Sequence, residues 1–188
     1  MPIRVNNVTK NNGGTSTYNQ RELALIRYNN TSVWRKTVTL TNLVGGGART
    51  DNRQLDAGYN DSTYTLLSTN LVAGHKYFVR GYVYTNGAWT MEPISTLTFY
   101  GATIASVSGN DKSQTNNIMQ TVSSNSGSVT HRVFGSVVAG TSSWCGSTLY
   151  MLVDVTPLEE ATGRTFTASQ FWSYIGSSVF YGSKDFVP

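Results

Sequence analysis

The sequence predicts an all-β protein built as an antiparallel β-sandwich, and two observations support this. Only 13% of the 188 residues are charged, while Gly, Tyr, Ser, Thr and Asn are abundant, a composition typical of strands and turns. From Thr37 onward, apolar stretches alternate with Gly, Asn, Asp and Ser clusters at the spacing of sandwich strands. The single cysteine, Cys145, cannot form an internal disulfide, so packing must stabilise the fold.

The N-terminal part of the chain is organised differently. We expect residues 1–36 to be an attachment segment and residues 37–188 to be the sandwich. The segment is expected to begin with a short strand, MPIRVNNV, and to continue after a polar connector. RELALIRY has some helical propensity, but the Asn-Asn turn after it favours a small β-hairpin over residues 22–38. Trp34, with Arg35 beside it, is the expected anchor, which either packs into the main domain or onto a partner.

The clearest strand of the predicted sandwich is HKYFVRGYVYTNGAWT. Its alternation places one set of residues on each face: Tyr77, Val79, Gly81 and Val83 on one, and Phe78, Arg80, Tyr82 and Tyr84 on the other. The Asn86-Gly87 dipeptide predicts a hairpin that turns the chain back through Trp89. Further strands are expected in TVTLTNLV, STYTLLST, ISTLTFYGATIASVS (a pair broken at Gly101), Ile118–Val122, VTHRVFGSVVAG and STLYMLVDVT.

One short helix is predicted near the C-terminus, in RTFTASQFWSYIG. Thr167 and Gln170 have the spacing of a capping box, and Gly176 follows as the stop signal. Phe171 and Trp172 contribute to an apolar face that should lie against the sandwich.

Charge and hydropathy argue against two classes of partner. The formal charge is +4, but Lys and Arg are scattered singly apart from Arg35-Lys36, so we expect no nucleic acid partner. No apolar run approaches the roughly 20 residues of a membrane helix, so no membrane insertion is expected. The N-terminus lacks the apolar stretch of a secretory signal, which predicts a soluble chain that is not exported by the ordinary route.

No catalytic or metal-binding constellation stands out, and we expect neither an enzyme nor a cofactor. The carboxylates lie mostly in turn-like places such as RTDNRQLD, and the adjacent pair Glu159-Glu160 would not face one substrate. A Ser-His-Asp triad stays open in a chain so rich in Ser, although no Gly-x-Ser-x-Gly elbow occurs. His75 and His131 have no metal-ligand spacing, and His131 is expected at the surface or hydrogen-bonded. Cys145 is expected to be an inert thiol.

The one candidate binding surface is an aromatic strand face. Arg80, Tyr82 and Tyr84 share it, and Trp89 is expected nearby through the Asn86-Gly87 turn. Aromatic faces stack on sugar rings while Arg and Tyr bond sugar oxygens, so a glycan is the candidate ligand. Alternatively, this face packs against the N-terminal segment, the terminal helix or a neighbouring subunit.

Several segments, in this order along the chain, resemble the carbohydrate-binding-like β-sandwich modules of tailed-bacteriophage structural proteins. They are NLVAGHKYFVRGYVYTNGAW, STLTFYGATIASVS, VTHRVFGSVVAG and LYMLVDVTPLEEATGRTFTASQFWSYIG, within about residues 37–188. The stretch PLEEATGRTF departs from the loop usual in that family. The opening of the chain, with Ile3, Val5 and then NTSVWRK, is similar to the opening of phage minor structural proteins.

The resemblance implies a jelly-roll-like sandwich that belongs to a non-enzymatic structural protein of a tailed bacteriophage. Such a protein would be displayed on the virion surface at the tail, baseplate, neck or head, after assembly in the bacterial host cytoplasm. Its expected partners are other virion proteins and further copies of the chain. The alternative is a glycan-binding module that recognises host surface polysaccharide. A third hypothesis, a polysaccharide-degrading enzyme, requires two carboxylates about 5–10 Å apart in a cleft.

Overall fold

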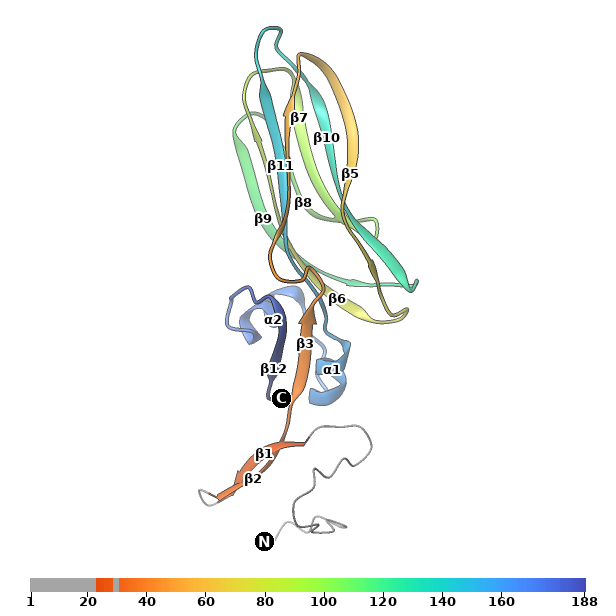
Figure 1. Cartoon of the computed structure of the whole chain (residues 1–188), viewed down its shortest axis with the longest axis vertical. Helices are drawn as coiled ribbons and strands as arrows, with labels where there is room; N and C mark the ends of the chain where they lie inside the picture. Colours follow the sequence, from red (N-terminus) through yellow and green to blue (C-terminus); the bar gives the residue numbers. More distant parts are fainter. Residues whose placement is uncertain (1–22, 29–30) are drawn as a thin grey trace.

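The computed structural model describes residues 23–28 and 31–188, and these form a tall β-sandwich above a small helical unit (Figure 1). In this part of the chain, eight strands make the sandwich: β4 (Arg49–Leu55), β5 (Gly58–Asn70), β6 (Lys76–Asn86), β7 (Trp89–Phe99), β8 (Ala102–Ser108), β9 (Lys112–Thr121), β10 (Ser126–Val137) and β11 (Ser143–Asp154).

The strand order is that of a jelly roll. One sheet runs β5-β10-β7-β8, and in the other β4 pairs with β11, followed by β6 and β9. All of these neighbours are antiparallel. Two four-stranded sheets whose members alternate along the chain in this way are the jelly-roll architecture. The predicted all-β, jelly-roll-like sandwich is therefore confirmed.

The second sheet is extended at one end by two short strands. β3 (Val38–Asn42) pairs with the C-terminal end of β11, and β12 (Gly182–Phe186) pairs with β3. The first and last parts of residues 37–188 therefore lie side by side, at the end where the helices lie (Figure 1).

The N-terminal hairpin is also present. β1 (Leu23–Tyr28) and β2 (Thr31–Lys36) are antiparallel and form a two-stranded sheet of their own, with Leu25 opposite Trp34. The hairpin prediction is thus confirmed, while the strand predicted at residues 1–8 lies outside the described residues.

The main core lies between the two sheets. The predicted alternation along β6 is confirmed, because Tyr77, Val79 and Val83 are buried in this core together with Leu97 and Phe99 of β7. The residues between them in sequence point to the outer side of the sheet. Gly81 also faces the core, where an added Cβ would collide with the side chain of Leu97, so close packing of the sheets requires glycine there.

A second core lies outside this sheet, under two short helices, α1 (Thr156–Thr162) and α2 (Ala168–Tyr174). Phe78 is fully buried there, with its ring centroid 4.9 Å from that of Phe171 and stacked on Trp172 at 6.2 Å. The helix predicted near the C-terminus is α2, and its capping box is confirmed by reciprocal hydrogen bonds between Thr167 and Gln170.

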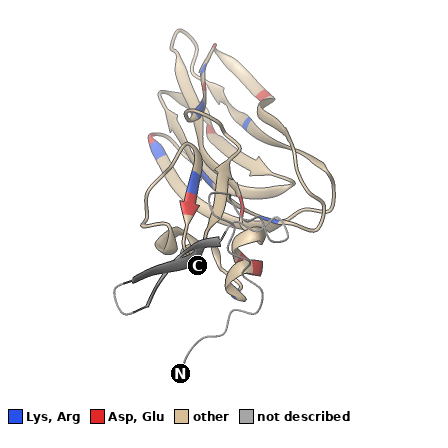
Figure 2. Cartoon of the chain, turned by 60° about the horizontal axis from the view of Figure 1, so that its bottom comes forward, with Lys and Arg blue, Asp and Glu red and all other residues tan. Residues whose placement is uncertain are grey.

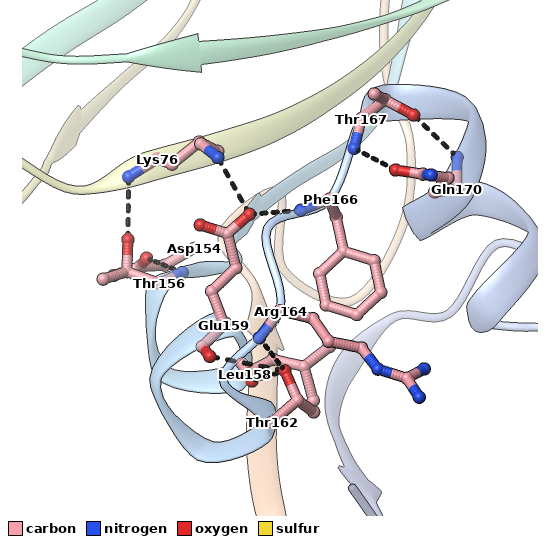
Figure 3. Close-up of polar contacts among 10 residues, drawn as sticks. All are labelled: Lys76, Asp154, Thr156, Leu158, Glu159, Thr162, Arg164, Phe166, Thr167 and Gln170. Carbon is pink, nitrogen blue, oxygen red and sulfur yellow. Dashed lines mark hydrogen bonds and ion pairs between the residues drawn. The ribbon is translucent and has the colours of Figure 1, made fainter.

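Helix α1 was not predicted, and a half-buried carboxylate, that of Glu159, ties it to the sandwich (Figure 3). Glu159 Oε1 accepts hydrogen bonds from Lys76 Nζ at 2.8 Å and from the backbone N–H of Phe166 at 2.6 Å. Thr156 Oγ1 accepts from the backbone N–H of Lys76 at 2.8 Å. The start of β6, the first turn of α1 and the approach to α2 are thus joined, while Glu160 is exposed and plays no part in this joint.

A single buried amide links β3, β11 and the C-terminal tail. The side chain of Asn42 is 1% exposed, and its Nδ2 donates to the carbonyl oxygens of Tyr150 at 3.0 Å and Phe180 at 2.8 Å. Its Oδ1 accepts from the backbone N–H groups of Val44 at 3.2 Å and Leu152 at 3.0 Å. All four bonding positions of the amide are therefore used at the point where the register of β11 shifts.

Four local predictions were wrong. RTDNRQLD was expected to be turn-like but contains strand β4, and β5 and β9 begin earlier than expected, within GYNDS and DKSQTNN. The Asn86-Gly87 turn does not close a hairpin, because β6 and β7 lie in different sheets. Gly87, with φ of 115°, carries the chain across the sandwich, so that the apolar faces of both strands point into the same core.

Candidate ligand-binding face

Away from the two helices, the outer side of the β4-β11-β6-β9 sheet carries the aromatic residues Tyr82, Tyr84 and Trp144, which together are named here the aromatic face. In the pairing of β6 with β11, Tyr84 lies opposite Gly146 and Trp144 lies opposite Asn86, so all three project to the same side. The two tyrosine rings stack with centroids 6.0 Å apart and planes inclined by 30°. Trp144 is 40% exposed, which leaves much of its ring open to a ligand.

Gly146 provides the space that Tyr84 occupies. A Cβ atom at this position would collide with the Tyr84 ring and lie 2.7 Å from Asn52 Oδ1. The ring therefore lies over the backbone of β11, where a larger residue would displace it. Burial, and secondarily the neighbouring Tyr82, raises the pKa of Tyr84, so its hydroxyl remains a hydrogen-bond donor at neutral pH.

Polar side chains border the aromatic face on both sides. Register places the following exposed residues on the same outer side: Thr50, Asn52 and Gln54 from β4, and Ser113 and Thr115 from β9. Aromatic rings flanked by amides and hydroxyls can stack on an apolar sugar face and bond its oxygens at the same time.

Arg80 lies on the same side of β6 as Tyr82 and Tyr84, but at the border of the aromatic face, next to α2. Its guanidinium lies 4.1 Å from the centroid of the Trp172 ring, and Nη1 donates to Asn117 Oδ1 at 2.6 Å. Burial lowers the pKa of Arg80. Of the predicted face, Arg80 therefore contacts the terminal helix, and its guanidinium is engaged in contacts within the protein.

Trp89 does not join the aromatic face. It begins β7 in the opposite sheet, and its side chain packs against an interior cluster that includes Val133, Val137 and Cys145. The expectation that the Asn86-Gly87 turn brings Trp89 beside Tyr82 is wrong, because that turn crosses between the sheets. Trp144 is the aromatic residue that sequence reasoning missed. The alternation of Trp144 with the buried Cys145 was the available signal.

The two predicted attachment residues, Trp34 and Arg35, both lie in β2. Their position in a separate hairpin agrees with an attachment segment, and their role as an anchor stays a prediction.

A hydrogen-bonded Ser-His-Asp cluster lies inside the sandwich. His131 Nδ1 is 2.8 Å from Asp51 Oδ2, and His131 Nε2 is 2.8 Å from Ser95 Oγ. This is the order of partners found in serine hydrolases. Both Ser95 and His131 are completely buried, however, so an external substrate cannot reach the Ser95 hydroxyl in this structure. The prediction of a hydrogen-bonded His131 is confirmed, whereas the turn position expected for Asp51 is wrong because it lies in β4.

The remaining candidate groups offer little reactivity. Burial raises the pKa of the Cys145 thiol to about 12, so the thiolate is not formed near neutral pH. Among residues 23–28 and 31–188, no three His, Cys, Asp or Glu side chains gather to hold a metal ion. Within the same residues, no helix has the length and apolar character needed to cross a membrane.

The fold places this chain in the class of two-sheet jelly-roll proteins. No family model and no curated protein matches the sequence. Among solved structures, the chain is similar to the VP2 subviral particle of infectious bursal disease virus, with a TM-score of 0.37 and 16% identity over 74% of this chain and 40% of that one. The Gx strain of the same virus gives a TM-score of 0.34 at 15% identity, over 74% of this chain and 39% of the other. The chain thus spans about 40% of the length of these structures.

Proposed function

We propose that this chain is a non-enzymatic structural protein of a tailed-bacteriophage virion, displayed on the particle surface and assembled through residues 1–36. The jelly roll supports the proposal because viral capsid domains use this architecture, although a fold alone does not determine a function. The segments that resemble phage structural modules, and the order in which they follow one another along the chain, support the proposal further.

The observation that carries the proposal is the division of charge and structure between the two parts of the chain. Residues 1–36 contain six of the fourteen Lys and Arg but one of the ten Asp and Glu, a formal charge of +5, whereas residues 37–188 carry −1. Figure 2 shows charges of both signs scattered over the sandwich. The β1–β2 hairpin pairs within itself, and an isolated two-stranded hairpin is marginally stable in water. Docking of residues 1–36 on an acidic virion protein would pair their positive charge and stabilise the β1–β2 hairpin.

Incorporation into particles tests this role. A tagged full-length chain and a tagged chain that begins at Thr37 are produced in host cells during phage growth, and gradient-purified virions are probed for each tag. We expect the full-length chain in the particles and the shortened chain outside them. Arg35→Glu combined with Lys36→Glu should reduce incorporation, since it reverses two of the cations in the segment. Absence of the full-length chain from virions, or equal incorporation of both chains, would contradict the proposal.

Recognition of a host surface polysaccharide is a second candidate function, favoured by the aromatic face. Its open Trp144 ring, the stacked tyrosine pair and the polar border have the chemistry that sugar rings require. The virion role and this one are compatible, because a displayed sandwich presents the face to the host.

Changing Trp144→Ala is expected to weaken polysaccharide binding about tenfold or more, since losing one stacking contact of about 1.4 kcal/mol has that effect. Stability should change little because the ring is 40% exposed. Calorimetric titration with extracted surface polysaccharides measures the binding.

Trp89→Ala is the matched control. It should destabilise the fold by about 2–4 kcal/mol, because the ring packs in the interior cluster, and should leave the affinity of the folded protein unchanged. Undiminished binding by both Trp144→Ala and Tyr82→Ala would rule out this face as the site.

A further inference from the structure

The buried cluster of Ser95, His131 and Asp51 connects strands of both sheets. His131 lies on β10 and Ser95 on β7 in one sheet, while Asp51 lies on β4 in the other. Ser95 Oγ is also 3.3 Å from the carbonyl oxygen of Gly146 on β11. We propose that this cluster makes the stability of the fold sensitive to pH: it stabilises the folded chain while His131 is neutral, and the folded chain loses stability when His131 gains a proton in mildly acidic solution.

The protonation state of His131 determines the direction of one hydrogen bond. An ionised Asp51 can only accept, so His131 Nδ1 carries the hydrogen of that bond. In neutral His131, Nε2 must then accept from the Ser95 hydroxyl. A proton added at Nε2 makes this nitrogen a donor, and the Ser95 hydroxyl must turn toward the Gly146 carbonyl at the longer distance of 3.3 Å. Protonation therefore reverses the short bond between His131 and Ser95 and places a positive charge in a site that is 0% exposed, beside an Asp51 carboxylate that Arg53 already contacts.

The surroundings oppose a positive charge on His131. The charged and titratable groups that face this space are Asp51 and Arg53 from β4, Tyr64 from β5 and Cys145 from β11, together with the Ser95 hydroxyl from β7. Arg53 Nε lies 2.6 Å from Asp51 Oδ1, so the negative charge of Asp51 is already shared with one cation. Its guanidinium also lies 3.9 Å from the Tyr64 ring centroid, which keeps it in the cluster.

Burial is the largest effect on His131 and lowers its pKa, more than the hydrogen bond to Asp51 raises it. An exposed histidine in the unfolded chain titrates near pH 6.5. Between that value and the lower pKa of the folded state, the unfolded chain binds more protons than the folded one. Stability is therefore fully present above about pH 6.5 and is lost as the pH falls toward the folded pKa.

The chain supplies its own control, since it contains two histidines. His75 is partly exposed and lies with Nδ1 2.6 Å from Asp154 Oδ2, outside the sandwich core. The full-length chain, His131→Gln and His75→Gln are each unfolded in urea at several values between pH 7.5 and 5.5. Glutamine is neutral in this range and can still donate to Asp51 and accept from Ser95.

We expect the unfolding equilibrium constant of the unmodified chain to rise, by at most about tenfold per pH unit, as the pH falls through this window. His75→Gln should retain this slope, and His131→Gln should lose it whatever its stability at pH 7.5. As a second readout, NMR titration of the unmodified chain should give His131 a pKa below 6.5. A His131 pKa at or above 6.5, or a slope that disappears in His75→Gln and persists in His131→Gln, would overturn the proposal.

Discussion

Replacing Asn42 with aspartate is expected to lower the free energy of unfolding by about 3–5 kcal/mol. The amide nitrogen of Asn42 donates to two buried carbonyl oxygens, those of Tyr150 and Phe180. A carboxylate would place an acceptor oxygen against both of them, in a site that is 1% exposed. Urea unfolding at pH 7.5 measures the change.

Asn52→Asp is the matched control for this substitution, because Asn52 is exposed on the outer side of β4. It should change stability by no more than about 0.5 kcal/mol. If Asn42→Asp were as mild as this control, the amide would not be what joins β3, β11 and the tail that ends in β12.

Replacing Phe78 with alanine is expected to cost about 3–5 kcal/mol, the range for a large aromatic residue removed from a packed core. Phe78 is fully buried between the outer side of β6 and α2, in contact with Phe171 and Trp172. The cavity would lie directly beneath α2. We therefore also expect the substitution to increase the rate of hydrogen exchange in that helix more than in β10. Both effects are measured on the same protein, by urea unfolding and by exchange mass spectrometry.

Tyr59→Ala serves as the control for Phe78. The Tyr59 ring contacts Phe134 edge-on, yet the residue is 65% exposed, so its removal should cost less than about 1 kcal/mol. Unchanged exchange in α2 after Phe78→Ala would mean that the helix is held by the Glu159 joint instead of by the aromatic core.

The sequence allowed prediction of the elements whose signals are local. Thr167 and Gln170 predicted α2 because a capping box requires only three residues of spacing. The alternation along β6 predicted which residues would be buried, since side chains on a strand alternate strictly. Helix α1 has the same length as α2 but escaped prediction because it has no side-chain cap, and its charged Glu159 is fixed by the distant Lys76.

The candidate sites were harder to predict because they depend on contacts between distant parts of the chain. Asn86-Gly87 has the composition of a hairpin turn, but only the pairing of β6 with β11 shows that the chain crosses to the other sheet there. Because the chain crosses between the sheets at this turn, Trp89 packs against the interior cluster, and Trp144 is the tryptophan that lies on the aromatic face. Likewise, Asp51 and His131 are 80 residues apart, so no local pattern could bring them together.

The order of strands has a consequence for how the protein is made. β10 lies between β5 and β7, and β11 lies between β4 and β6, yet these two central strands are the last of the eight along the chain. A ribosome-bound chain that ends before β10 can form the β6–β9 and β7–β8 pairs but neither complete sheet. Their unpaired edges would meanwhile be open to association with other chains. The sandwich must therefore close late, after Asp154 has left the ribosome.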